Sequence, residues 1–166
     1  MFNCICTIPI YAHEDTTKSF IQLVSFDLNN PNKQAQLIHF DDKTIKVTMS
    51  EELSAETKGI FISYGNYSRR FTWNDPGVCT ISAVFTGYIN PMQCRVTNIS
   101  DGRYTNAVAT FIRDRYVLLN SDTTGGGRYE VDYSLSGTGT HTQGVNVVID
   151  HASSEGNATV GYYAKW

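Results

Sequence analysis

The chain has 166 residues, with 13 Lys or Arg against 16 Asp or Glu, and its formal net charge is −3 at pH 7. This length predicts one domain over residues 1–166 that buries its own hydrophobic core without help from disulfides or metal ions. The small negative charge excludes a nucleic acid or an anionic membrane held by bulk electrostatics. No apolar run approaches the ~20 residues that a membrane span needs.

Residue types that favour strands dominate the composition. Val, Ile, Thr, Tyr, Phe and Trp number 63, whereas Ala, Leu, Glu, Lys, Met and Gln number 36. β-Branched and aromatic side chains pack well on a pleated surface and lose rotamer freedom in helices. Charged residues are only 17% of the chain, and Ser, Thr and Asn supply 43 residues. The composition therefore predicts an all-β protein with a polar but weakly charged surface.

Alternating apolar residues predict closely spaced strands in the first half of the chain. The expected strands cover 3–11, 20–28, 34–40 and 43–49, of which 20–28 also fits helical spacing. Segment 50–57 is the one predicted helix, one or two turns long, with Ser50 as a plausible N-cap and two Glu in its first turn. Strands resume at 59–64 and 67–73 and lead into the turn sequence Asn74-Asp75-Pro76-Gly77.

The second half of the chain continues the same pattern. Strands are expected at 78–89, 93–99, 105–112, 116–119, 129–136, 145–149 and 160–166. They are separated by a turn at 100–102, a hairpin turn at 113–115 and a flexible Gly-rich loop at 122–127. About 10–12 short strands of this kind predict an antiparallel two-sheet β-sandwich or jelly-roll-like fold, with at most one short helix near 50–57.

The four cysteines leave two interpretations open. Cys79 and Cys94 have a separation that suits a disulfide between neighbouring strands, whereas Cys4 and Cys6 share one face of a predicted strand. Alternatively, all four are buried free thiols in a reducing compartment. A zinc site of these cysteines lacks the usual paired knuckles. We expect neither a metal ion nor a cofactor.

Motifs that would indicate catalysis are missing from the sequence. Gly125-Gly126-Gly127 is followed by Arg128 and a strand, without the Lys-Ser/Thr and helix start of a phosphate-binding loop. There is no Gly-x-Ser-x-Gly elbow, and the four His are scattered without metal-ligand spacing. The sequence therefore predicts a protein that is not an enzyme.

The segment 64–75 concentrates aromatic rings with amide, carboxylate and guanidinium groups beside a turn. Sugars are bound by such mixtures, because rings stack on C–H faces while planar polar groups pair with hydroxyls. The predicted glycan-binding residues are Asn66, Tyr67, Arg69, Trp73, Asn74 and Asp75. The alternative is that Tyr and Trp fill the core, while Arg69-Arg70 protect a strand edge from aggregation.

These observations predict a non-enzymatic recognition protein that is lectin-like and forms a homo-oligomer, because single shallow sugar sites gain from multivalency. Its expected partners are neutral glycans or copies of itself. One alternative is a structural self-assembly protein, such as a capsid, tail or filament subunit, since an uncharged Thr- and Asn-rich surface loses little on desolvation. A second alternative is a pore-forming toxin that inserts the hairpin 129–150, whose Ser/Thr/Gly bias is shared by membrane-inserting hairpins.

No signal peptide is evident, because the first 12 residues lack Lys and Arg. The sequence leaves the location of the protein open. Cytoplasmic synthesis followed by non-classical release or by particle assembly is compatible with it.

Overall fold

The computed structural model describes residues 23–30, 32–51, 65–150 and 156–165. This part of the chain consists of ten strands joined by turns, with no helix among the described residues. The strands are β1 (Leu23–Asp27), β2 (Gln34–His39), β3 (Thr44–Glu51), β4 (Gly65–Asp75), β5 (Cys79–Ile89), β6 (Cys94–Asn106), β7 (Thr110–Leu118), β8 (Gly125–Leu135), β9 (Gly139–Asp150) and β10 (Asn157–Lys165).

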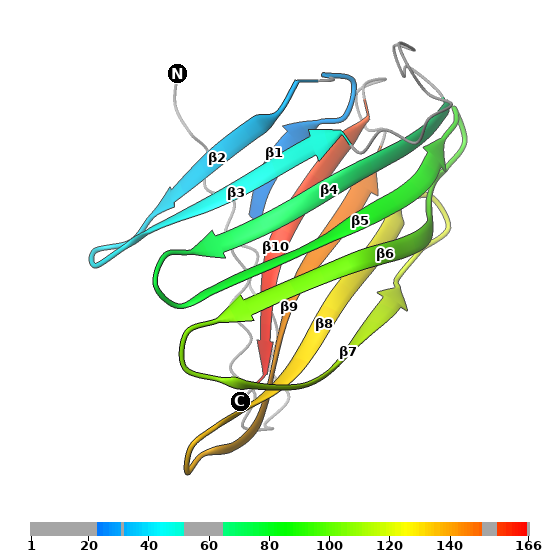
Figure 1. Ribbon diagram of the computed structural model, residues 1–166. Helices are drawn as coiled ribbons and strands as arrows, with labels where there is room; N and C mark the ends of the chain where they lie inside the picture. The colour runs from blue at the N-terminus through cyan, green and yellow to red at the C-terminus, as the bar shows by residue number, and fades with distance from the viewer. Residues whose placement is uncertain (1–22, 31, 52–64, 151–155, 166) are drawn as a thin grey trace, which may run out of the picture.

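The strands form two antiparallel sheets of five strands each. Sheet A has the order β1-β10-β9-β8-β7, and sheet B has the order β2-β3-β4-β5-β6. Figure 1 shows sheet B in front of sheet A, so the predicted all-β sandwich is confirmed. Within that class, each sheet is a meander whose strands follow chain order, apart from β1, rather than a pair of the Greek keys that make a jelly roll.

The core lies between the inward faces of the two sheets. Side chains alternate along each strand, so that every second residue points inward. Phe71 of sheet B contacts Phe85 edge-on, with ring centroids 5.7 Å apart, and Phe26 of sheet A at 6.3 Å. Val131 and Val147 complete this layer from sheet A and are fully buried.

Three consecutive glycines belong to a strand rather than to the predicted flexible loop. Gly125, Gly126 and Gly127 are buried and begin β8, where they pair with β9. A Cβ on Gly126 would lie 2.4 Å from the carbonyl oxygen of Leu119, and one on Gly127 would lie 2.7 Å from Ile99. Glycine is therefore required here by close packing, which composition alone does not distinguish from loop flexibility.

Two predicted turns are continuous strand. The sequence 113–115 lies inside β7. Arg113 and Arg115 point outward there and form ion pairs with acidic residues of β8. The sequence 100–102 lies inside β6 as a β-bulge, in which Asp101 has a positive φ of 44°. In both places, polar residues that suit a turn are used on the solvent side of a strand.

The predicted short helix at 50–57 does not begin at Ser50. Ser50 and Glu51 continue β3 and pair with Arg70 and Arg69 of β4, so the cross-strand ladder outweighs the capping tendency of Ser50. The rest of that segment, and the strands expected at 3–11 and 59–64, lie outside the described residues. The hairpin of 34–40 with 43–49 and the turn near Asn74-Asp75-Pro76-Gly77 are confirmed.

Cys79 and Cys94 are buried free thiols. They lie at opposite ends of the β5–β6 pair, since Cys79 is opposite Asn106 and Cys94 is opposite Ile89, so no disulfide joins them. Burial raises the pKa of both thiols to about 11. They act as small apolar side chains.

The close packing of the β8 glycines is testable with Gly126→Ala. The added methyl group would meet the Leu119 backbone, so we expect the free energy of unfolding to fall by about 1–3 kcal/mol in urea denaturation. An unchanged midpoint would show that this segment is not held against Leu119.

Candidate functional site

The six predicted glycan-binding residues all lie on β4, in the interior of sheet B. Four of them, Tyr67, Arg69, Trp73 and Asp75, point toward sheet A and are 2–8% exposed. The other two, Asn66 and Asn74, point outward, and they are separated by most of the strand, ~26 Å at the usual rise per residue. The structure therefore does not bring the six side chains together on one surface.

The inward residues bind other parts of the protein. Trp73 stacks on Tyr162 of sheet A at a centroid distance of 5.1 Å, and the hydroxyl of Tyr67 donates a hydrogen bond of 2.9 Å to the carbonyl of Arg95. Asp75 forms an ion pair of 2.7 Å with Lys43. These contacts account for the side chains as structural groups, as the alternative interpretation of the segment expects for its rings.

Arg69 joins the two sheets at one end of the sandwich. Its Nη2 donates a hydrogen bond of 2.9 Å to the carbonyl of Leu28, which follows β1 of sheet A, and its Nη1 lies 3.6 Å from a carboxylate oxygen of Glu51. Burial lowers the pKa of Arg69, and the charge of Glu51 acts in the opposite direction. The guanidinium of Arg69 is thus a structural cross-link and not a surface group.

The outward face of β3, β4, β5 and β6 is covered by small polar side chains, and we call it the polar face. The cross-strand pairing places them in rows that run across the four strands. Its hydroxyl and amide residues are Thr48, Ser50, Asn66, Ser68, Thr72, Asn74, Thr80, Ser82, Thr86, Asn98, Ser100 and Thr105. Such a surface offers many hydrogen-bond donors and acceptors.

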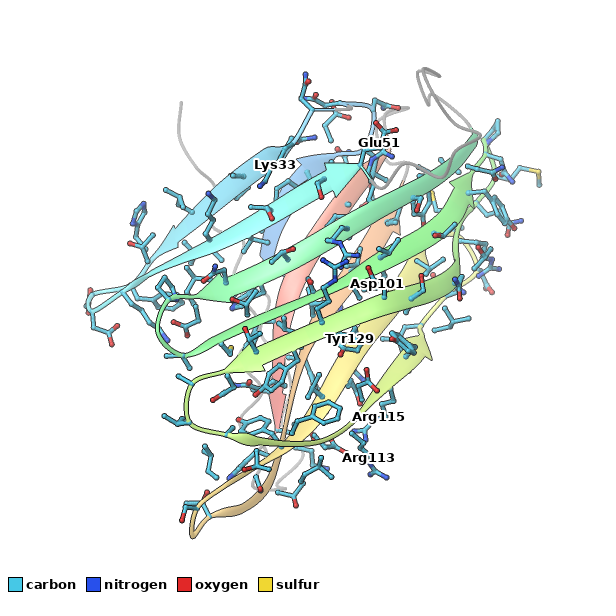
Figure 2. All side chains as sticks on the ribbon, viewed as in Figure 1. Lys33, Glu51, Asp101, Arg113, Arg115 and Tyr129 are labelled. Carbon is cyan, nitrogen blue, oxygen red and sulfur yellow. The ribbon has the colours of Figure 1, made fainter. Side chains whose placement is uncertain are left out.

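An ion-pair cluster of two arginines and one aspartate lies at the centre of the polar face. Arg70 is 8% exposed, and its guanidinium donates to Ser82 Oγ and to the carboxylate and backbone carbonyl of Asp101. Arg103 forms a second ion pair with Asp101 at 2.7 Å. Hydrogen bonds from Arg103 and Arg70 hold the pKa of Asp101 below its usual range. Figure 2 shows Asp101 in the middle of this face.

One end of the polar face carries an aromatic ring. Tyr88 is half-buried and lies in a cross-strand row between Asn66 and Arg95, and its hydroxyl accepts a hydrogen bond of 3.1 Å from Gln93 Nε2. We call these four residues the aromatic corner. The sequence predicts Tyr88 only as part of an apolar strand. Its position in the strand indicates that it points outward, because Tyr88 is an odd number of residues from the buried Phe85 and Ile89, whose side chains point inward.

The described residues hold no group of three or more His, Cys, Asp or Glu side chains placed to bind a metal ion. No helix in the described part of the chain has the length and apolar character that crossing a bilayer demands.

No protein-family model matches the sequence, and no curated protein matches it. A solved structure of a hypothetical protein, lmo2686 from Listeria monocytogenes EGD-e, aligns with 82% of this chain and 99% of its own. The sequence identity is 14% and the TM-score is 0.45, values at which the similarity assigns no function.

The structural role of Tyr67 predicts the outcome of Tyr67→Phe. The change removes only the hydroxyl that donates to the Arg95 carbonyl, so we expect chemical denaturation to show a loss of about 1 kcal/mol in the free energy of unfolding. Tyr88→Phe is the matched control, because its hydroxyl contacts the side chain of Gln93 at the surface and its loss should cost less. Equal effects of the two changes would contradict this assignment.

Proposed function

We propose that the protein is a non-enzymatic recognition protein that binds neutral glycans through the polar face of sheet B. The observation that supports this function is the aromatic corner, where the ring of Tyr88 lies beside the side chains of Asn66, Gln93 and Arg95. An aromatic ring packs against the C–H face of a pyranose, while amide and guanidinium groups form hydrogen bonds with its hydroxyls.

The neighbouring rows of the polar face extend this site along the sheet. Ser68, Thr86 and Asn98 form the next row, and the hydroxyls of Ser68 and Thr86 are 3.3 Å apart. A neutral ligand that lies along these rows exchanges hydrogen bonds with water for hydrogen bonds with the protein and displaces no counterions. The proposed site therefore favours an extended neutral oligosaccharide over a charged ligand.

This proposal retains Asn66 from the predicted site and moves the aromatic contact from Trp73 to Tyr88. Trp73 is 2% exposed and stacked on Tyr162, so its fluorescence is not a reporter of ligand binding at the polar face. A shallow face of this kind binds weakly as a single site, and multivalent display in a homo-oligomer would raise its avidity.

The glycan-binding proposal is testable by a pair of matched variants on β4. Binding partners are first identified with an array of neutral oligosaccharides. Asn66→Ala removes an amide from the aromatic corner and should weaken binding of the best array ligand about fivefold by calorimetry. Asn74→Ala removes the same amide from the far end of the same strand face and should leave the affinity unchanged. Tyr88→Ala should weaken binding by about tenfold, because the stacking surface is lost.

An array without any neutral ligand would overturn this function. Equal losses of affinity in Asn66→Ala and Asn74→Ala would show that the protein binds glycans but that the site is not the aromatic corner.

Self-assembly is the second candidate function, and exposed apolar side chains on β7 favour it. Phe111, Ile112, Tyr116 and Leu118 are 45–52% exposed on this edge strand. Phe111, Tyr116 and Leu118 pair with Tyr133, Tyr129 and Gly127, all of which face the core. They remain partly exposed because β6, the last strand of sheet B, packs over β8 and covers the inner side of β7 only in part, through the hydrogen bond of 3.2 Å from Gly102 N to the Tyr116 hydroxyl. Exposed apolar strand edges are typical sites of association.

Assembly through β7 predicts a concentration-dependent increase in mass by sedimentation. Leu118→Gln should shift the distribution toward monomer, whereas Val148→Gln, which changes an exposed Val on the outward face of β9, should not. A wild-type protein that stays monomeric at all concentrations would contradict this candidate. The pore-forming alternative has the least support, because β8 and β9 are interior strands of sheet A and their release would break pairing with β7 and β10.

A further inference from the structure

The outward face of sheet A carries a network of charged side chains that is separate from the cluster of Arg70, Asp101 and Arg103 on the polar face. Arg113 and Arg115 of β7 and Arg128 of β8 surround two acidic residues of β8, Glu130 and Asp132. We call the three arginines the guanidinium patch. Figure 2 shows Arg113 and Arg115 beside each other near β7, and both contact the same carboxylate of Asp132.

Short ion pairs connect the members of this network. Arg113 Nε and Arg115 Nη1 lie 2.8 Å and 2.7 Å from Asp132 Oδ2. Arg115 Nε and Arg128 Nε each lie 2.5 Å from one of the two carboxylate oxygens of Glu130. Guanidinium groups thus contact both oxygens of Glu130 and one oxygen of Asp132, and the cross-strand alternation places the whole network on one face.

The guanidinium groups of the network are exposed to solvent, whereas its carboxylates are buried. The side chains of Glu130 and Asp132 are each 6% exposed, whereas those of Arg113, Arg115 and Arg128 are 70%, 41% and 22% exposed. Three positive charges cover two negative charges, so the patch has a net positive charge on a protein whose net charge is −3. The surface that a ligand meets here is formed by guanidinium groups.

Neighbouring groups hold the patch in a fixed arrangement. The guanidinium carbon of Arg128 lies 4.0 Å from the ring centroid of Tyr163, and Thr142 Oγ1 donates a hydrogen bond of 2.7 Å to Asp132. Burial alone would raise the pKa of Asp132, but hydrogen bonds from Arg113, Thr142 and Arg115 outweigh it and lower that pKa to about 2. Asp132 is therefore charged over the whole physiological pH range, and the ion pairs hold the arginines in place before a ligand binds.

The free donors of the patch suit oxyanions. Within the described part of the chain, the ion pairs use the Nε atoms of the three arginines and one Nη of Arg115, which leaves the remaining Nη groups for a ligand. Guanidinium forks bind sulfate and carboxylate groups through paired charge-assisted hydrogen bonds. Lys165 of β10 is exposed and lies opposite Thr142 on the same face, so positive charge continues along the sheet.

The shape and size of the patch select among anionic partners. Its arginines lie on the surface of a sheet, on the neighbouring strands β7 and β8, so the patch suits a chain that presents oxyanions at intervals. Polybasic clusters that bind a bilayer surface lie beside a membrane-spanning helix or on an amphipathic helix, and nucleic-acid-binding domains are basic overall. The patch lies on a β-sheet of a protein whose net charge is −3, so it meets neither description.

We propose that the guanidinium patch binds the sulfate or carboxylate groups of an acidic polysaccharide. This site lies on the opposite side of the sandwich from the polar face and does not depend on neutral-glycan binding there. An acidic polysaccharide held on sheet A would leave the aromatic corner of sheet B open.

The proposal is tested with heparin as the sulfated probe and dextran as the neutral one, by calorimetry at low salt. We expect heparin to bind with an affinity that falls as NaCl is added, because salt screens exposed charges, and we expect no binding of dextran to the patch. Arg113→Gln should weaken heparin binding by about five- to tenfold. The thermal unfolding midpoint should fall only slightly, because Arg115 and Thr142 still form hydrogen bonds with Asp132.

Arg103→Gln is the matched control, because it removes the same charge from a 66% exposed side chain on the other sheet. It should leave heparin affinity unchanged, and Arg113→Glu should abolish binding. Equal losses in Arg103→Gln and Arg113→Gln would overturn the assignment, since they would indicate attraction to the whole protein. The assignment would also be overturned if heparin did not bind, or if the protein bound phosphatidylserine vesicles and not heparin. Loss of neutral-ligand binding in Asn66→Ala with intact heparin binding would separate the two sites.

Discussion

The close contact of β8 with β5 and β6 is the constraint on which the rest of the structure depends. Gly127 of β8 leaves the space that Ile99 and Phe85 fill, and Gly102 of β6 leaves the space for the ring of Tyr129. These small residues allow the two sheets to approach while large side chains interdigitate between them. Because β6, the last strand of sheet B, is fixed over β8, the inner face of β7 at the edge of sheet A is only partly covered.

This contact also determines which residues reach the solvent. Side chains alternate with a period of two, so the inward phase of β4, β5, β8 and β9 fixes the outward phase of the same strands. In sheet B the outward residues are hydroxyls and amides, with Arg70 neutralised by Asp101. In sheet A they are arginines over buried carboxylates. A register slip of one residue would exchange core and surface on a strand, so the chemistry of both faces is tied to the packing of the core.

The sequence predicts the strands better than it predicts their faces. The sandwich, the hairpin of β2 with β3 and the turn after β4 follow from periodicity and from Asn, Asp, Pro and Gly. The residue types of segment 64–75 suit sugars and predict an exposed site, yet Tyr67 and Trp73 fill the core. Composition does not show which set of alternate side chains in a strand points inward. The roles of Gly125–Gly127 and Arg113–Arg115 were missed for a related reason, because they depend on partners that are distant in sequence.

The low charge content of the chain has a different meaning once the faces are assigned. A net charge of −3 argues against partners held by bulk attraction, but charges in salt act over a Debye length of only about 8–10 Å. Within that range, a ligand on sheet A meets Arg113 and Arg115, whereas a ligand on the polar face meets hydroxyl groups and the cluster in which Arg70 and Arg103 share Asp101. Since burial of Glu130 and Asp132 hides the negative half of the network, a protein with few charges presents a locally positive surface. The arrangement of the charges, and not their number, therefore decides which partners each face accepts.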